Sequence, residues 1–153
     1  MLNGFGKLRL RSVVAPQMPK TERHRLYVEM NKEQHVLYQQ FLDDGYVWNE
    51  ETGTMHVAST SMERVLFFRK LLVTPKLIDP SYGVGAAIEG LGDEFEELEG
   101  DARHIVVFTP FIDAIPVISE YLRGRGAKAV FTLQGGVEPD DLRFRIQEWK
   151  KLR

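Results

Sequence analysis

The chain has 153 residues, of which 43% are hydrophobic, 27% charged and 10% aromatic, and its formal net charge is −2. This composition is typical of one globular domain and excludes collagen-like, low-complexity and wholly disordered chains. The absence of cysteine excludes disulfides, iron–sulfur clusters and thiolate zinc sites. No apolar run approaches the roughly 20 residues that cross a bilayer, and the first residues lack the apolar core of a secretory signal. We therefore expect an intracellular, cytoplasmic protein with no membrane partner.

Charge is distributed unevenly along the chain. Residues 1–35 contain seven Lys or Arg residues against three acidic ones, whereas residues 77–102 contain eight acidic residues and no Lys or Arg. Solvated surface would explain both segments. The alternative is that the basic segment faces a polyanion and the acidic loop faces away from it. On that alternative Arg9 and Arg11, with Lys20 nearby, are candidates for phosphate contacts, because phosphate neutralisation gives affinity without sequence preference.

The first half of the chain predicts a connector, a strand and two helices. Residues 1–22 predict a basic connector with little regular structure, because two prolines interrupt them. Alternation of apolar residues predicts a strand over 22–30. The sequence from Asn31 to Gln34 resembles a capping box and predicts a helix that ends at Gly45.

A turn or short hairpin is predicted next, over 46–53. A second capping-box pattern, from Thr60 to Glu63, predicts a strongly apolar helix that Pro75 stops. The acidic region after it is poorly periodic, and only 86–91 predicts a short helix.

The C-terminal part predicts the order strand, helix, strand, helix. Residues 104–109 form a β-branched run that is typical of a strand buried on both faces. Asp113 is the expected N-cap of the following helix, and 128–133 is the second predicted strand. Gly135 and Gly136 form a turn before the last helix, which has Pro139 at its first position. Such a unit has parallel strands and a right-handed crossover.

Several stretches, taken in order, carry a family resemblance. They are Lys7 to Ser12, Met18 to Glu22, Lys32 to Tyr38, Leu66 to Pro75, Val106 to Phe111, Leu133 to Gly136, and Trp149. In this order they resemble the lobe junction and the first half of the C-terminal motor lobe of Swi/Snf-type helicase-like ATPases, within helicase superfamily two. Gln134 and Gly136 stand where the family usually has Asp and Ser, a drift that resembles viral or phage relatives.

The resemblance implies an α/β fold, specifically a partial RecA-like lobe of the P-loop NTPase type. It divides the chain into a basic connector (1–22), a helical and extended part with an acidic loop (23–102) and an incomplete β-α-β-α unit (103–153). It implies part of a DNA-dependent ATPase that translocates on double-stranded DNA. Candidate contacts to the nucleic-acid backbone are the turns after the two strands, with the residues Thr109, Pro110, Phe111, Gly135 and Gly136.

The motifs of phosphoryl transfer are missing from the sequence. No P-loop, no Asp-Glu-x-His box and no Gln-x-x-Gly-Arg-x-x-Arg segment occurs. We therefore expect no ATP turnover by this chain alone and no cofactor in it, with ATP and Mg²⁺ needed only by the intact motor. Expected partners are double-stranded DNA and the missing motor halves, and two unpaired parallel strands also favour self-association into a homo-oligomer.

Two alternatives remain open. The chain could be a non-catalytic module that binds a protein or a nucleic acid, or a small-molecule enzyme on a truncated α/β fold. The histidines lack metal-binding spacing, the serines lack a G-x-S-x-G setting, and the acidic run does not match a calcium loop. These patterns therefore predict neither a metal site nor a hydrolase triad.

Overall fold

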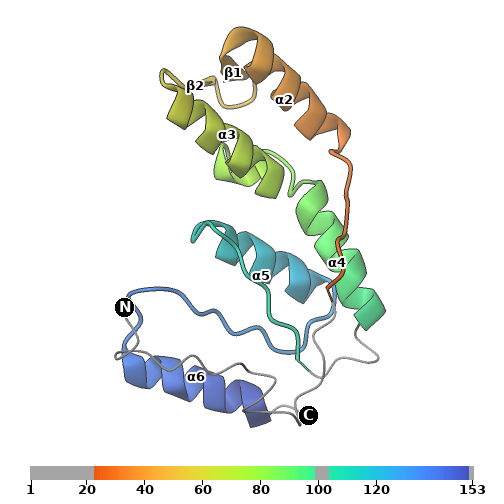
Figure 1. Ribbon diagram of the computed structural model, residues 1–153, viewed down its shortest axis with the longest axis vertical. Coiled ribbons are helices and arrows are strands. Elements are labelled where there is room, and N and C mark those ends of the chain that lie inside the picture. Colours follow the sequence, from red (N-terminus) through yellow and green to blue (C-terminus); the bar gives the residue numbers. More distant parts are fainter. Residues whose placement is uncertain (1–22, 99–103, 152–153) are drawn as a thin grey trace, which may run out of the picture.

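The computed structural model describes residues 23–98 and 104–151. In chain order they form helix α2 (Lys32–Asp44), strands β1 (Tyr46–Asn49) and β2 (Thr54–Val57), helix α3 (Ser61–Val73), the short 3₁₀ helix η1 (Pro75–Leu77), and helices α4 (Ala86–Leu98), α5 (Ala114–Gly124) and α6 (Pro139–Lys151). The molecule is elongated: α2, the hairpin and α3 lie at one end, α4 and α5 lie in the middle, and α6 lies at the other end (Figure 1).

Helix α2 begins and ends where the sequence predicts. The Asn31 side chain accepts a hydrogen bond from Gln34 N at 2.9 Å, and the Gln34 side chain accepts one from Asn31 N. This reciprocal pair satisfies backbone N–H groups that have no partner inside the helix. Gly45 ends the helix with a φ of +76°, a left-handed conformation that glycine adopts without a steric penalty.

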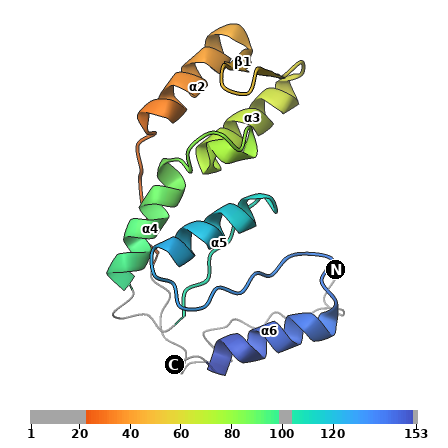
Figure 2. The same cartoon turned by 180° about the vertical axis from the view of Figure 1, so that it is seen from behind.

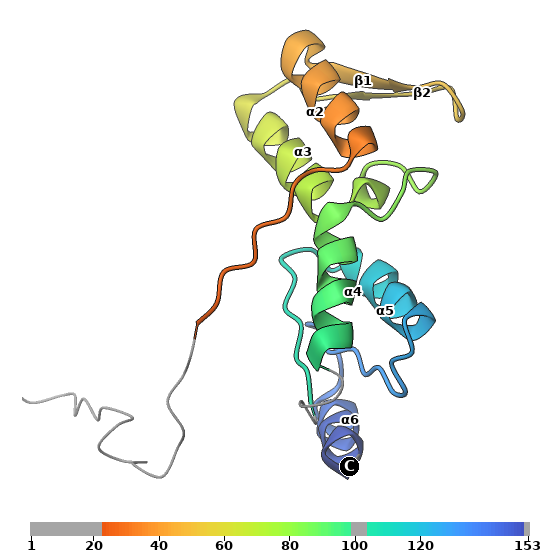
Figure 3. The same cartoon turned by 90° about the vertical axis from the view of Figure 1, so that its right-hand side faces the viewer.

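A turn or short hairpin is predicted over 46–53, and the structure has a two-stranded antiparallel hairpin there whose second strand extends to Val57. Tyr46 lies opposite Val57 and Trp48 lies opposite Met55. One face of β1, with Val47 and Asn49, is buried, whereas the four residues opposite one another on the other face are exposed. Figure 3 shows the hairpin projecting beyond α2 and α3.

The first hydrophobic core lies between α2, the hairpin and α3. Phe41 stacks on Phe67 with ring centroids 3.6 Å apart and meets Phe68 edge-on at 5.2 Å. Val47 and Leu71 are fully buried in the same cluster. Helix α3 begins at the predicted capping box, in which Glu63 N donates to Thr60 Oγ1 at 3.2 Å.

A buried glutamine joins three helices at the edge of this core. Gln34 is only 1% exposed, and its Nε2 donates to Leu71 O at 2.8 Å while its Oε1 accepts from Ala86 N at 2.8 Å. These bonds satisfy a carbonyl of α3 and the first N–H of α4, both of which are buried with the glutamine. The side chain of one α2 residue therefore links the last turn of α3 to the first residue of α4.

The acidic region is more helical than the sequence predicts. The helix expected over 86–91 continues to Leu98 as α4, so the predicted acidic loop is wrong over 92–98. Ile88 and partly buried Phe95 lie on the face that packs against α5, and the pairing of Asp93 and Glu96 with Arg125 reduces the repulsion within the acidic run.

The second core is smaller and joins α4 to α5. Ile88 from α4 packs with Ala114, Ile118 and Leu122 from α5. Asp113 precedes α5 as predicted, but its side chain makes no capping hydrogen bond. Pro116 lies in the first turn of the helix, where its missing N–H has no partner to lose.

The predicted strands do not form among the described residues. Residues 23–30 are extended but exposed, and neither 104–109 nor 128–133 pairs with another strand. Burial of 104–109 on both faces is also wrong, since Phe108 is 90% exposed. An extended segment becomes a strand only when a neighbour completes its hydrogen bonds, and these segments have no such neighbour here. The described residues therefore fit a mixed α/β class loosely, without a RecA-like parallel sheet.

Helix α6 starts at Pro139 as predicted and rests on the two extended segments. Arg145 Nη1 donates to Thr132 O at 2.8 Å, and the His104 ring lies 4.3 Å from the ring of Trp149. None of its residues is buried. Within the described ranges no helix is both long and apolar enough to cross a membrane.

Candidate nucleic-acid interface

The turn that contains Thr109, Pro110 and Phe111 lies directly before α5. Phe111 N donates to Thr109 Oγ1 at 3.3 Å, so the Thr109 hydroxyl already takes part in a hydrogen bond within the turn. The Phe111 ring packs on the second core, and Pro110 is exposed. Local packing thus accounts for Thr109 and Phe111, and Pro110 has no backbone N–H to donate to a phosphate group.

A cation that sequence reasoning missed lies beside this turn. The guanidinium carbon of Arg69, on α3, is 6.0 Å from the centre of the Phe111 ring, a cation–π geometry at its outer limit. Arg69 is exposed and forms no ion pair within the described residues. Positive charge beside a backbone turn is what a phosphate group needs. No local signal relates residues 69 and 111, because only tertiary packing brings them together.

The second predicted turn, at Gly135 and Gly136, is exposed and uncrowded. Gly136 has a φ of +83°, and a Cβ built on either glycine would meet no atom within 4 Å. Three carboxylates follow in the chain, those of Glu138, Asp140 and Asp141, and within the described residues only Asp140 has a cation near it, Arg143 at 3.6 Å. These carboxylates would repel a phosphate group. The Phe111 turn with Arg69 is therefore the better candidate of the two.

The two turns share an orientation but no contact. Helices α5 and α6 both begin on the same side of the molecule, on the left in Figure 1 and on the right in Figure 2. No hydrogen bond or ion pair joins the two turns in the part of the chain that the structure describes. The remaining candidates, Arg9 and Arg11, lie outside the described residues, as does Lys20.

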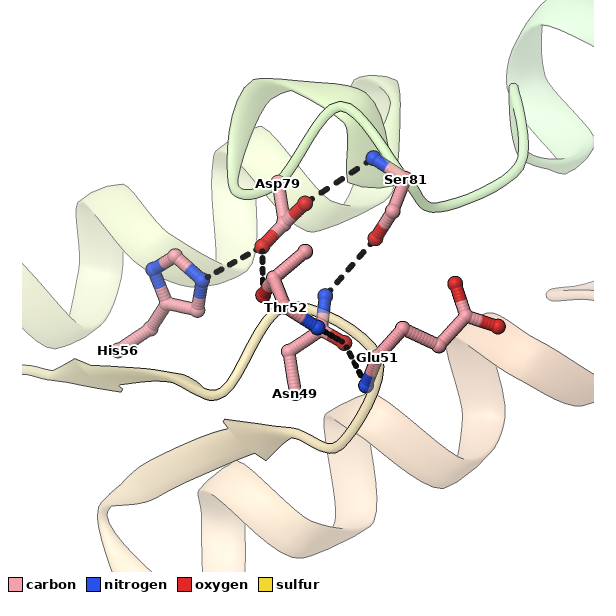
Figure 4. A network of polar contacts seen from close by, with 6 residues as sticks. All are labelled: Asn49, Glu51, Thr52, His56, Asp79 and Ser81. Carbon is pink, nitrogen blue, oxygen red and sulfur yellow. Dashed lines mark hydrogen bonds and ion pairs between the residues drawn. The ribbon is translucent and has the colours of Figure 1, made fainter.

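A second polar site, which the sequence did not predict, joins the hairpin to the segment after η1 (Figure 4). At its centre is Asp79, which is 5% exposed. Its carboxylate accepts hydrogen bonds from Ser81 N and from Thr52 Oγ1, each at 3.0 Å, and its Oδ2 lies 3.4 Å from His56 Nε2. Three residues, two from the hairpin and one from the segment after η1, thus converge on one carboxylate.

These contacts hold Asp79 in its ionised form. The hydrogen bond from the backbone of Ser81 is the largest cause that lowers the pKa of Asp79 well below its ordinary value, and burial opposes this shift. Hydrogen bonds from the side chains of Ser81, Thr52 and His56 lower the pKa further. Donors that favour the charged form outweigh the cost of its desolvation.

The arrangement does not form a catalytic triad. The Oγ atom of Ser81 accepts a hydrogen bond from Asn49 Nδ2 at 2.8 Å, whereas His56 points to Asp79. Without a contact between the serine hydroxyl and the histidine, no base activates a nucleophile. Asn49 Oδ1 also accepts from Glu51 N and Thr52 N, so the network acts as a clamp on the hairpin turn.

No group of three or more His, Asp or Glu side chains in residues 23–98 and 104–151 is arranged to hold a metal ion.

The chain matches no family model, and no curated protein and no solved structure is significantly similar to it. The assignment of function therefore depends on the motifs in the sequence and on the geometry described above.

Proposed function

We propose that this chain is part of a helicase-like, DNA-dependent ATPase that translocates on double-stranded DNA. It would contribute backbone contacts from the second motor lobe. The order of motifs along the sequence, which resembles Swi/Snf-type ATPases, is the basis of the proposal. ATP and Mg²⁺ would bind in the intact motor, whose other half this chain would need as a partner.

The observation that carries the proposal furthest is the cation beside the Phe111 turn. Arg69 comes from α3 and Phe111 from the segment before α5, and their contact brings a positive charge beside the turn for which phosphate contacts are predicted. The residues from 104 to 151 also keep the order extended segment, helix, extended segment, helix, although their strands are unpaired. Both features support backbone contacts and neither provides a means of reading bases.

Binding to a labelled DNA duplex tests this proposal. We expect weak binding that is insensitive to sequence and that weakens steeply as salt increases. Arg69→Ala should lower affinity and reduce the slope of log K against log salt by about one. Arg64→Ala is the matched control, since Arg64 is also on α3 but lies beside Gly45. Arg9→Ala combined with Arg11→Ala tests the predicted basic segment.

Two results would count against the proposal. A sequence preference that survives moderate salt would contradict contacts to the backbone alone, and equal losses in the Arg64 and Arg69 variants would contradict a site at Phe111. Phosphate release with and without DNA tests the partial-motor interpretation. Turnover by the chain alone in the usual enzyme range of about 1–1,000 per second would overturn it.

A non-catalytic interaction module is the second candidate, and the exposed apolar residues of the two extended segments favour it. Val106 and Phe108 on the first segment and Leu133 on the second are exposed. Apolar side chains beside unpaired backbone invite another strand or a second copy of the chain. Light scattering over a wide range of concentration tests for self-association, and a strictly monomeric chain would argue against it.

A further inference from the structure

A groove runs between strand β2 and helix α3, about 360 Å³ in volume. Met55 and Val57 line it from the strand, Leu66 and Lys70 line it from the helix, and Ile78 lies at its end. Leu66 is exposed although it is apolar, whereas the Met55 and Val57 side chains lie on the outer face of the hairpin, so these two residues border the groove along the edge of the strand. The groove therefore has an apolar wall along α3 that no described part of the chain covers.

The strand wall of this groove has an open backbone edge. In the described residues the sheet has two strands, so β2 pairs on one side only. Ala58 N donates to the directly opposite Gly45 O, which identifies this pair as a hydrogen-bonded one. Because hydrogen-bonded pairs alternate in an antiparallel ladder, His56 turns its N–H and C=O groups to β1, and Met55 and Val57 turn theirs outward.

Lys70 provides the cation that an acidic occupant would meet in the groove, whose lining also includes the ionised carboxylate of Glu63. The carboxylate of Glu63 accepts hydrogen bonds from Ser59 N at 2.7 Å and Thr60 N at 3.0 Å, and it is thereby engaged in the cap of α3. His56 faces Asp79. Lys70 lines the groove and has no ion-pair partner within the described residues, so its charge is available to a ligand.

We propose that this groove binds an extended, acidic segment of a partner protein by strand addition to β2. The backbone of the segment would pair with the outward groups of Met55 and Val57. Every second side chain would lie on the apolar wall toward Leu66, and an acidic side chain would meet Lys70. Main-chain hydrogen bonds supply affinity in this mode of recognition, and pockets for alternate side chains supply specificity.

This inference is independent of DNA binding, because the groove lies between β2 and α3 and includes neither Arg69 nor Phe111. A failure of the peptide experiment would leave the proposed function untouched, and the reverse also holds.

Synthetic peptides of alternating valine and threonine with one central residue changed are the probes. A peptide with glutamate at the centre should bind the full chain about tenfold more tightly than one with lysine, as measured by fluorescence anisotropy. Lys70→Glu should reverse this preference. Lys76→Glu is the matched control, since it changes net charge equally at a residue outside the groove.

Two measurements on the unaltered chain keep the test independent of how the variants fold. Two versions of the glutamate peptide are compared, one with methyl groups on its odd-numbered backbone nitrogens and one with them on its even-numbered backbone nitrogens. One of the two versions should bind about tenfold or more weakly, because its methyl groups remove the N–H donors that pair with β2. Hydrogen exchange should slow at the Met55 and Val57 amides when the peptide is bound.

Several outcomes would overturn the proposal. They are no binding of the glutamate peptide, equal binding of the glutamate and lysine peptides, insensitivity to either alternation of methylation, and unchanged exchange at Met55 and Val57. A dimer in sedimentation that the peptide fails to dissociate and that masks the same amides would assign the groove to a second copy of the chain instead.

Discussion

The two ends of the molecule differ in how completely they bury their side chains. In residues 32–78 two capped helices and a hairpin enclose Phe41, Val47 and Leu71. In residues 104–151 only α5 contributes buried apolar residues, which pack against α4, and α6 buries none. The difference shows what each kind of element needs in order to bury its side chains. A helix with its own caps needs only another element to pack against, whereas an extended segment also needs a partner strand.

The largest expected contrast between the ends comes from removing one phenylalanine from each. Phe41 is 1% exposed and contacts two other rings, so Phe41→Ala should lower the free energy of unfolding by about 3–5 kcal/mol. Phe144 on α6 is 62% exposed, and Phe144→Ala should change it by less than about 0.5 kcal/mol. Urea unfolding followed by circular dichroism measures both. Equal losses would mean that α6 is as well packed as α2.

A second test concerns the buried polar side chain of Gln34 at the well-packed end of the molecule. Gln34→Ala leaves Leu71 O and Ala86 N buried without partners, and each such group costs about 1–3 kcal/mol of stability. Gln39→Ala on the same helix is the control, because Gln39 is exposed and bonds only to Asp43 among the described residues. If both variants unfold at the same urea concentration, Gln34 does not join the three helices in solution.

Two glycines with the same φ angle test how closely the chain packs around each of them. Gly85 and Gly136 both have a φ of +83°, so alanine costs about 1–2 kcal/mol of conformational energy at either position. At Gly85 an added Cβ would also lie 2.7 Å from Pro75 Cδ and 2.8 Å from Gln34 Nε2, whereas at Gly136 it would meet nothing. Gly85→Ala should therefore be the more destabilising, and thermal unfolding of the two variants checks the order.

The smallest expected effect is a gradual dependence on pH from Asp79. The pKa of Asp79 is lower in the folded chain than in the unfolded chain, where it is about 4. The stabilisation from this carboxylate is therefore complete above about pH 5 and is lost as pH falls through 4 toward the folded pKa. Asp79→Asn should be less stable than the unaltered chain at pH 7 and should lose less stability between pH 5 and pH 3.

Asp140→Asn is the control for this pH experiment, since the Asp140 side chain is 96% exposed. Urea unfolding of the three proteins at each pH provides the comparison. The same pH slope in the Asp79 variant and in the unaltered chain would show that other groups produce the dependence.

The sequence by itself determined where several helices of this protein begin or end. Capping boxes at Asn31 and Thr60, the left-handed Gly45 and the leading Pro139 all mark helix ends correctly, because each acts within a few residues of the backbone groups that it satisfies. The turn over 46–53 is also predicted from the sequence, but the second strand of the hairpin, Thr54–Val57, is not. The extent of α4 was underestimated, since Asp93 and Glu96 on this helix pair with Arg125, which follows α5.

Only the tertiary structure decided whether extended segments became strands and which side chains met. Residues 104–109 and 128–133 have strong strand patterns, yet a strand is a property of two segments, and no described neighbour completes theirs. The same holds for two contacts between residues that share no local signal: Arg69 lies beside Phe111, and Asp79 meets Thr52 and His56. The physical reason is the sequence separation of the interacting groups. A capping side chain bonds to backbone groups a few residues away, whereas a charged group, an aromatic ring or a buried carboxylate interacts with any residue that the fold places beside it.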